Sequence, residues 1–479
     1  SLLAEAKGSL TRTRTYPDVR DVSGQDPRIG VFVCSCGINI SNTVDVKTVT
    51  DYAAGLPNVV YTENNLFTCS TDTQDLIAAK IREHDLNRIV VAACTPRTHE
   101  PLFQDTLREA GLNPYLLEMA NIRNQNAWVH QGEPEKATEK ARYQVRMAVA
   151  RVTHNYALDR VSVPVVQKAL VVGGGISGMA AALGLAGQGF DTVLVEKTDT
   201  LGGNAWHINE TWKGEPVRPM LEALIDKVQD HPGVTVMTSA QITSAEGSVG
   251  NFSSQIESRD GVTEVQYGIA VMATGAAEYT PTEYRYGKNP RVMTHFEFDA
   301  AVNENTDRTR KAESVVFIQC VGSRNTSRPY CSRVCCTHSV KSAIGLKKLN
   351  PDMNVFILHR DIRTYGDREL LYKQARDIGV IFIRYTLEQK PVVTDIDGEL
   401  FVELYDTAMR DSVQIYADYL VLAAAVVPND VSDLSELYKC GVNTEGFLNE
   451  AHPKLRPVDM SVDGLFLAGM CHFPKPIDE

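Results

Sequence analysis

The 479-residue sequence predicts an α/β protein built around parallel β-sheets. Short β-branched apolar runs, such as RIGVFV at 28–33 and RIVVAA at 88–93, alternate with amphipathic segments of helical period. That alternation is typical of buried parallel strands and the helices that cover them. A glycine-rich turn joins a strand to a helix within 168–187, and another strand–helix alternation begins near residue 314. Together these observations predict three successive α/β units.

Composition and charge exclude several classes of function. The chain is 43% hydrophobic and 23% charged, as in an ordinary globular protein. Its formal net charge of −12 argues against nucleic acid or an anionic membrane as the main partner. No apolar run approaches the roughly 20 residues that span a bilayer, so no transmembrane segment is expected. Residues 1–28 lack an apolar signal core and are predicted to form a loose N-terminal arm of a cytoplasmic protein.

The first α/β unit is predicted at 29–150. Its helix TDTQDLIAAKIREH is expected to start from an N-cap at Thr71 or Asp72. The helix PLFQDTLREAGL is expected to stop at Gly111. The charged segment 133–156 has helical character and is predicted to be a long connector, exposed along one face.

The glycine turn of the second unit carries the pattern G-x-G-x-x-G at Gly173, Gly175 and Gly178. The turn follows the strand ALVV, opens a helix, and precedes an acidic residue, Glu196, at the end of the next strand. Such glycines let the backbone approach a pyrophosphate at a helix N-terminus, and the acid can accept a hydrogen bond from a ribose hydroxyl. The pattern therefore predicts a dinucleotide site. The alternative is that the glycines serve only close packing of the helix on the strand.

Three further motifs favour FAD over NAD as the dinucleotide. LGGNAW at 201–206 follows the acidic residue closely, and MATGA at 272–276 and LFLAG at 465–469 lie far downstream. This three-part layout resembles the FAD domain of flavoproteins with two dinucleotide folds, the thioredoxin reductase type. The resemblance implies that the C-terminal motif returns to the second unit as its final strand.

The resemblance places the FAD domain at 166–280 plus 431–479. Where that type has Asp after the last glycine, this chain has Met470, so the contact with the ribityl chain must differ. The predicted cofactor-binding residues are Gly173, Gly175, Ile176, Ser177, Gly178, Glu196, Lys197, Gly202, Gly203, Asn204, Ala205, Thr274, Gly275, Gly469 and Met470.

The third unit, at 281–430, is predicted to be a second dinucleotide fold that lacks its glycine turn. Between the strand SVVFIQ and the helix SVKSAIGLKKL the turn holds only Gly322, together with the pattern C-x10-C-x3-C-C. Four thiolates are the ligand set of a [4Fe–4S] cluster, and N–H groups at a helix N-terminus stabilise an anionic cluster as they would a phosphate. The predicted metal ligands are Cys320, Cys331, Cys335 and Cys336.

Zinc and a disulfide remain alternatives for these four cysteines. Zinc usually takes pairs spaced C-x2–4-C, which only Cys331 and Cys335 approach. A redox dithiol normally has the pattern C-x-x-C, which is absent. The spacing therefore favours the cluster.

A second [4Fe–4S] cluster is predicted in the first unit. Cys34 and Cys94 end predicted strands, and Cys69 precedes a helix. Ligands bind at the carboxyl edge of a parallel sheet, where these positions converge, and Cys36 can supply the fourth thiolate. The alternative is that these are ordinary buried cysteines, which are common as small apolar residues.

Other residues are candidates for lesser roles. Lys341, early in the helix after the cysteine pattern, is predicted to be catalytic because a cation near the flavin would stabilise its reduced form and shift its potential. The alternative is a surface lysine. Cys440 is expected to be structural, and Cys471 is expected to line the flavin site. His99 and His338 lie near cysteines, but hydrogen-bonded polar histidines explain them more simply.

The segments CSCGINI, NLFTCS, VVAACTPRTHEPLF, GGGISGM, YCSRVCC and LFLAGMC together closely resemble the A-type polypeptide of heterodisulfide reductase, over roughly 29–479. The resemblance implies an oxidoreductase component that couples FAD to iron–sulfur clusters. In several complexes of that family the flavin is thought to bifurcate electron pairs. The implied partners are B- and C-type reductase subunits, ferredoxin, and hydrogenase or formate dehydrogenase modules, in an oligomer.

The sequence departs from the family in one respect that leaves alternatives open. It has no C-x2-C-x2-C-x3-C run of the ferredoxin-type domains that many members carry, so the chain is truncated or another polypeptide supplies those clusters. Related A-type subunits serve menaquinol-linked and benzoyl-CoA reductase complexes. A free-standing NAD(P)H-dependent flavin disulfide reductase is a further alternative, weakened by the missing second glycine turn. A third alternative is a non-catalytic scaffold that binds FAD.

Overall fold

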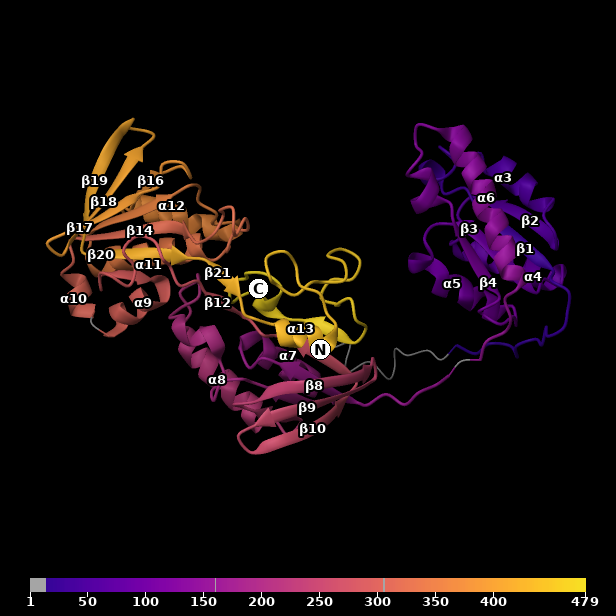
Figure 1. Ribbon diagram of the computed structural model, residues 1–479, viewed down its shortest axis with the longest axis horizontal. Helices are drawn as coiled ribbons and strands as arrows, with labels where there is room; N and C mark the ends of the chain where they lie inside the picture. Colours follow the sequence, from indigo (N-terminus) through magenta and orange to yellow (C-terminus); the bar gives the residue numbers. More distant parts are fainter. Residues whose placement is uncertain (1–13, 160, 305) are drawn as a thin grey trace. The chain divides into compact units, whose positions relative to one another are not determined.

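The computed structural model describes residues 14–159, 161–304 and 306–479. The chain divides into two compact units, one ending at Ser162 and one comprising Val163–Glu479 (Figure 1). Each unit has its own hydrophobic core, so each is described by itself. The finer division of the second unit into a FAD domain and a cysteine-bearing domain remains a prediction.

The first unit is built on a four-stranded parallel sheet in the order β2-β1-β3-β4. Its central strands are buried along their whole length, as apolar runs between two helical layers should be. The strands are β1 (Ile29–Cys34), β2 (Val59–Asn65), β3 (Arg88–Ala93) and β4 (Leu117–Asn121), and the helices are α3 (Val46–Ala54), α4 (Thr71–Glu83), α5 (Pro96–Glu109) and α6 (Pro134–Thr153).

Helix α6 is exposed along one face as predicted, and a stripe of small and β-branched side chains on its other face, including Ala141 and Val145, packs into the core. Two other details of this unit differ from the predictions. The N-cap of α4 is Ser70, one residue before the predicted positions. The predicted arm is not wholly loose either: Val22 is buried, and the Arg20 amide donates to the Gly111 carbonyl at 2.8 Å. Residues 1–13 of the arm lie outside the described residues.

The second unit contains two five-stranded parallel sheets. The first has the order β22-β11-β5-β6-β7, so the strand formed by LFLAG returns to this sheet as predicted. Its strands are β5 (Lys168–Val172), β6 (Asp191–Val195), β7 (Val234–Met237), β11 (Ile269–Met272) and β22 (Leu465–Leu467). Helices α7 (Ile176–Ala186), α8 (Val217–Asp230) and α13 (Ser432–Tyr438) belong to this part, with an antiparallel sheet of β8 (Gln241–Ser248), β9 (Asn251–Ser258) and β10 (Gly261–Tyr267).

The other parallel sheet has the order β13-β20-β14-β15-β16. Its strands are β13 (Val292–Thr294), β14 (Ser314–Val321), β15 (Asn354–His359), β16 (Ile381–Arg384) and β20 (Tyr419–Ala424). The helices are α9 (His295–Glu304), α10 (Thr306–Arg310), α11 (Cys335–Leu349) and α12 (Glu369–Asp377). A second antiparallel sheet consists of β17 (Val392–Ile396), β18 (Glu399–Asp406) and β19 (Asp411–Ala417).

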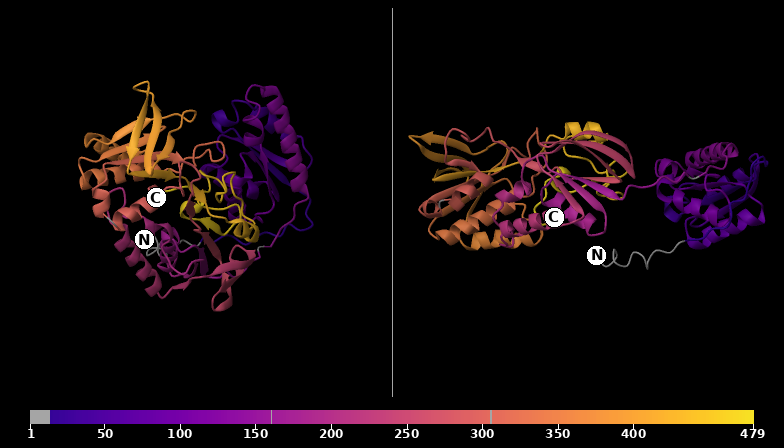
Figure 2. Two further views of the ribbon diagram at one scale, coloured as in Figure 1. Left: turned by 60° about the vertical axis from the view of Figure 1, so that its left-hand side comes forward. Right: turned by 90° about the horizontal axis from the view of Figure 1, so that it is seen from below.

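The two parallel sheets are joined by a pair of short crossing strands, β12 (Ala276–Glu278) and β21 (Val426–Pro428). The two antiparallel sheets, β8–β10 and β17–β19, lie at opposite ends of the unit (Figure 2). A parallel sheet with an appended three-stranded sheet thus occurs twice, which confirms the predicted thioredoxin-reductase-like architecture of two dinucleotide folds. The first unit precedes them in the sequence. Within the described parts of the chain, no helix is long and apolar enough to cross a membrane.

Candidate functional site

A cavity of about 770 Å³ lies within the second unit, bordered by the glycine turn, the β12–β21 pair, α9, α11 and the last residues of the chain. It brings together every predicted cofactor-binding residue except Gly178, although these come from five separate stretches of sequence. The lining residues among the predicted set are Gly173, Gly175, Ile176, Ser177, Glu196, Lys197, Gly202, Gly203, Asn204, Ala205, Thr274, Gly275, Gly469 and Met470.

The glycines of the turn have different roles. Gly173 has φ +111°, and a Cβ there would lie 2.3 Å from the Ala273 carbonyl oxygen. A Cβ on Gly178 would lie 1.8 Å from the Gly173 carbonyl oxygen, so this residue serves close packing. Gly175 has open space around it at the start of α7. Packing alone therefore explains two of the three glycines, and the third leaves room for a ligand at a helix N-terminus.

Polar groups at the cavity wall suit a dinucleotide. Glu196 is buried, and its carboxylate accepts hydrogen bonds from the Gly174 amide at 2.6 Å and the Thr198 amide at 2.8 Å. These bonds fix the carboxylate where it lines the cavity. The hydroxyl of Thr274 is buried there and has no hydrogen-bond partner among the described residues. An unpaired buried hydroxyl is costly, so a ligand atom that bonds it would relieve that cost.

Lys341 and His338, both candidates from the sequence, each contact an acidic residue at the cavity wall that sequence reasoning did not find. Lys341 on α11 forms an ion pair with Glu210, with an Nζ–Oε2 distance of 3.1 Å. His338, one turn earlier, has its Nε2 atom 2.7 Å from Asp299 Oδ2 on α9. Burial lowers the pKa of Lys341, and the hydrogen bond from its ammonium group to Glu210 opposes that effect. No local motif marked the two acids, because their roles depend on tertiary contacts alone.

The four cysteines predicted to bind a cluster converge at the edge of the second parallel sheet. Cys320 lies near the end of β14, and Cys335 and Cys336 open α11. Burial raises the pKa of Cys335 well above its usual value, and the charges of the three other cysteines raise it further. Burial likewise raises the pKa of Cys336 to about 12. A metal would therefore have to displace protons from thiols that are neutral without it.

We call residues 320–336 the four-cysteine loop. Its backbone is strained, because Cys320, Arg324 and Arg333 all have positive φ values, of 61°, 54° and 60°. Each such conformation costs about 1–3 kcal/mol for a residue other than glycine and persists only where the surroundings enforce it. Gly322 is also constrained, since a Cβ there would lie 2.3 Å from the ring of Tyr279.

The cysteines of the first unit also converge at one sheet edge. Cys34 ends β1, and the Thr68 amide donates to its Sγ atom at 3.4 Å. Burial raises the pKa of Cys34, and the charge of Cys36 contributes to that increase. Burial also raises the pKa of Cys94, with smaller increases from the charges of Cys69 and Cys34. Each of the four thiols is therefore close enough to at least one other for their charges to interact.

Among the described residues, no three His, Cys, Asp or Glu side chains are arranged as ligands of a single metal ion. A four-iron cluster spreads its thiolates over a larger cage than one ion does, with each cysteine on a different iron. Both cysteine sets thus remain predictions as cluster ligands.

The remaining cysteines are placed apart from these sets. Cys440 is buried, and its thiol contacts only the Leu434 carbonyl among the recorded hydrogen bonds of the described chain, in keeping with a structural role. Cys471 does not line the cavity as expected: its thiol turns toward the Met272 carbonyl at 3.1 Å, and Met470 faces the cavity instead.

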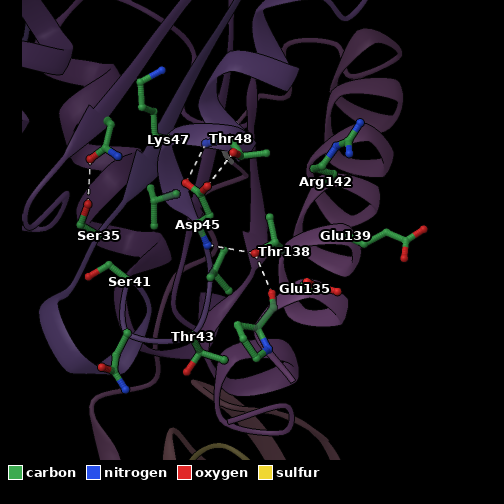
Figure 3. A pocket seen from close by; sticks show the side chains of 15 residues that line it. Ser35, Ser41, Thr43, Asp45, Lys47, Thr48, Glu135, Thr138, Glu139 and Arg142 are labelled. Atoms are coloured by element: carbon green, nitrogen blue, oxygen red, sulfur yellow. Dashed lines mark hydrogen bonds between the residues drawn. The ribbon is translucent and has the colours of Figure 1, made fainter. Parts of the chain in front are cut away.

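A second cavity, of about 780 Å³, lies in the first unit between α3 and α6 (Figure 3). Its polar groups bond to one another. The Asp45 carboxylate accepts a hydrogen bond from the Thr48 amide at 3.0 Å, and the Asp45 amide donates to Thr138 Oγ1 at 2.9 Å. The Thr138 hydroxyl in turn donates to the Pro134 carbonyl. These bonds cap α3 and fasten it to α6.

The fold and the cavity define the class of protein. Two dinucleotide folds share a cavity at which a glycine turn, a fixed carboxylate and a thiol-rich loop meet, an arrangement that characterises a dinucleotide-dependent oxidoreductase. Residues 171–220 match the family of NAD(P)-binding Rossmann-like domains, which agrees with that class.

Comparison with known proteins gives the family. The chain is 35% identical to the second A-type iron–sulfur polypeptide of CoB–CoM heterodisulfide reductase from Methanopyrus kandleri, over 95% of this chain and 83% of the relative. The A-type polypeptide of the H2:CoB–CoM heterodisulfide, ferredoxin reductase from Methanothermobacter thermautotrophicus matches with the same identity and coverage. The chain therefore belongs to the family of A-type heterodisulfide reductase polypeptides, known as HdrA.

Two further comparisons add detail. The alignment with the Methanopyrus protein spans 549 positions, more than the 479 residues of this chain, so that relative has internal segments with no counterpart here. Among solved structures, T. acidophilum thioredoxin reductase matches with a TM-score of 0.45 and 14% identity, over 64% of this chain and 91% of that one. That likeness is too distant to bear on function.

Proposed function

We propose that this chain is the FAD- and iron–sulfur-containing electron-transfer component of a heterodisulfide-reductase-type complex, and that it serves electron bifurcation there. Bound flavin supplies two-electron chemistry and each [4Fe–4S] cluster supplies one-electron chemistry, so the two together allow an electron pair to be divided. The A-type subunits of menaquinol-linked and benzoyl-CoA reductase complexes remain the closest alternatives.

One observation carries this proposal. The second dinucleotide fold presents four cysteines at the edge where the first presents its glycine turn. In the first fold, the space around Gly175 is open at the start of α7. In the second, Gly322 packs against Tyr279 and two thiols begin α11. These features support a thiolate-bound metal cluster at the second fold over the pyrophosphate of a pyridine nucleotide.

The residues of the cavity have separate roles in this proposal. The glycine turn and Glu196 bind the dinucleotide, and Thr274 offers a free hydroxyl. Glu210 holds the ammonium group of Lys341 at the cavity wall, where that group can stabilise the reduced, anionic state of a bound flavin. The predicted N-terminal set of Cys34, Cys36, Cys69 and Cys94 holds a second cluster.

The partners we propose follow from the names of the relatives. The Methanothermobacter protein is named for H2 and ferredoxin, and a relative from Methanococcus maripaludis, 32% identical, is named for H2, formate and ferredoxin. We propose that this chain works with the same classes of partner, namely ferredoxin, hydrogenase or formate dehydrogenase modules, and B- and C-type subunits. The segments present in relatives and absent here fit a complex in which another polypeptide carries additional clusters.

Anaerobic purification with flavin, iron and sulfide analysis tests the proposal. We expect flavin absorbance superposed on a broad band near ~400 nm that dithionite bleaches, as iron–sulfur proteins show. Flavin without iron, and rapid bleaching of that flavin by NADPH alone, would identify a pyridine-nucleotide-dependent disulfide reductase instead. Flavin that no physiological reductant reduces would leave a structural FAD-binding scaffold.

A further inference from the structure

The four-cysteine loop carries an ion pair directed at one of its cysteines. Arg324 donates from Nη1 to Cys320 Sγ at 3.8 Å. The same guanidinium pairs with both carboxylate oxygens of Asp361, and the distance from Nη2 to Oδ2 is 3.3 Å. The Arg324 side chain is only 19% exposed, so solvent and salt screen its charge incompletely.

This geometry is held from several sides. Arg324 has φ 54°, a conformation that a side-chain-bearing residue rarely adopts. Arg360 donates to the carbonyl of Arg324 at 2.7 Å and to the carbonyl of Ser323 at 3.2 Å. Asp361 accepts a further hydrogen bond from Arg363 Nε at 3.1 Å. The loop thus keeps Arg324 beside the sulfur of Cys320 in spite of backbone strain.

We propose that Arg324, held by Asp361, is a positioning residue that sets the reduction potential of the cluster in the four-cysteine loop. This inference rests on the proposed function. A cation beside a thiolate ligand favours the more negative, reduced state of the cluster, so it raises the midpoint potential. Asp361 acts in the opposite sense, because its negative charge reaches the cluster ligands, Cys336 among them.

The test is a redox titration of the full-length protein, loaded with flavin and iron, in which the cluster signals are followed by electron paramagnetic resonance. Arg324→Gln is expected to shift one cluster to a more negative midpoint potential. Asp361→Asn is expected to shift the same cluster to a more positive potential. Arg324→Lys keeps the positive charge, so the midpoint potential of the cluster should lie close to that of the unmodified protein. Mere damage to the loop would not move the first two variants in opposite directions.

Arg328→Gln is the matched control. It removes the same charge from the same loop, but Arg328 stacks over the ring of Tyr279 at 4.4 Å and has no recorded contact with a cysteine sulfur among the described residues. Its shift should be clearly smaller than that of Arg324→Gln.

Equal shifts in the two arginine variants would overturn the inference, as would unchanged potentials or shifts of Arg324→Gln and Asp361→Asn in the same direction. If Arg324→Gln fails to retain iron, Arg324→Lys and Asp361→Asn decide together: a potential near that of the unmodified protein in the first and a more positive potential in the second support the inference, and any other pair of results overturns it. Absence of iron from the unmodified protein would instead refute the proposed function.

Discussion

Lys341 and Glu210 form an ion pair, with an Nζ–Oε2 distance of 3.1 Å, that joins the second dinucleotide fold to the first at the wall of their shared cavity. Lys341 is a quarter exposed and Glu210 about half exposed, so the lysine is the more deeply held partner. Glu210 therefore holds the ammonium group of Lys341 at the wall of the cavity that the glycine turn borders. This pair links the cofactor site to the helix that begins with two of the four cysteines.

Replacing Lys341 should make the flavin harder to reduce. Because Lys341→Ala removes the charge that favours the anionic reduced flavin, we expect its midpoint potential to fall by about 30 mV or more, which corresponds to about 1.4 kcal/mol for a two-electron couple. Lys348→Ala, on the exposed side of the same helix, is the control and should change the potential far less. Equal potentials in the unmodified protein and Lys341→Ala would refute the role of this lysine.

Replacing Gly173 should abolish flavin binding. An alanine there must adopt φ +111° and place its Cβ 2.3 Å from the Ala273 carbonyl oxygen, so the turn cannot keep its shape. We expect Gly173→Ala to be purified with less than about a tenth of the normal flavin, since the strain and the clash together exceed about 1.4 kcal/mol. Gly184→Ala, in the helix that follows the turn and with open space around it, should retain flavin. A fully loaded Gly173→Ala protein would contradict the assignment of the turn.

The first unit should bind iron by itself. It has its own core around β1 and β3, and all four of its cysteines lie at one edge of its sheet. A fragment of residues 14–158, reconstituted anaerobically, should hold about four irons, the content of one [4Fe–4S] cluster. Cys94→Ser in the same fragment should lose them. If the folded fragment binds no iron, its cysteines are ordinary buried residues.

NADPH should not reduce the flavin directly. The turn of the second fold is filled where a pyrophosphate would need space, because Gly322 faces the ring of Tyr279. We expect no bleaching of flavin absorbance when NADPH is the only reductant, and full bleaching by dithionite. Tyr279→Ala, which opens that space, is a second test. If the thiols occupy the helix N-terminus, NADPH should still fail to reduce the flavin of this variant.

The parts of the site that could be predicted from sequence are those encoded by contiguous patterns. The glycine turn, Glu196 and the cysteine spacings are local signals. The structure brings the turn and the acid to one cavity and the members of each cysteine set near one another, while their roles as ligands stay predictions. Strand β22 was predictable because LFLAG is an apolar run with a terminal glycine.

What could not be predicted depends on contacts between distant segments. Glu210 and Asp361 lie in irregular segments, and nothing in their neighbourhoods indicates that each will meet a cation from another element. The partner of the buried stripe of helix α6, which includes Ala137 and Ala141, could not be predicted because the stripe packs on strands that come earlier in the chain. The Cys471 thiol turned away from the cavity because the short helical turn after β22 directs the neighbouring Met470 there instead.

The central claim is that the second dinucleotide fold holds a cluster in place of a pyridine nucleotide, and an iron count tests it most directly. The double variant Cys335→Ser and Cys336→Ser, purified anaerobically beside Cys440→Ser, should lose about four irons per chain while keeping its flavin, and Cys440→Ser should keep both. Iron content unchanged by the double substitution would contradict the account, because the four-cysteine loop would then hold no cluster.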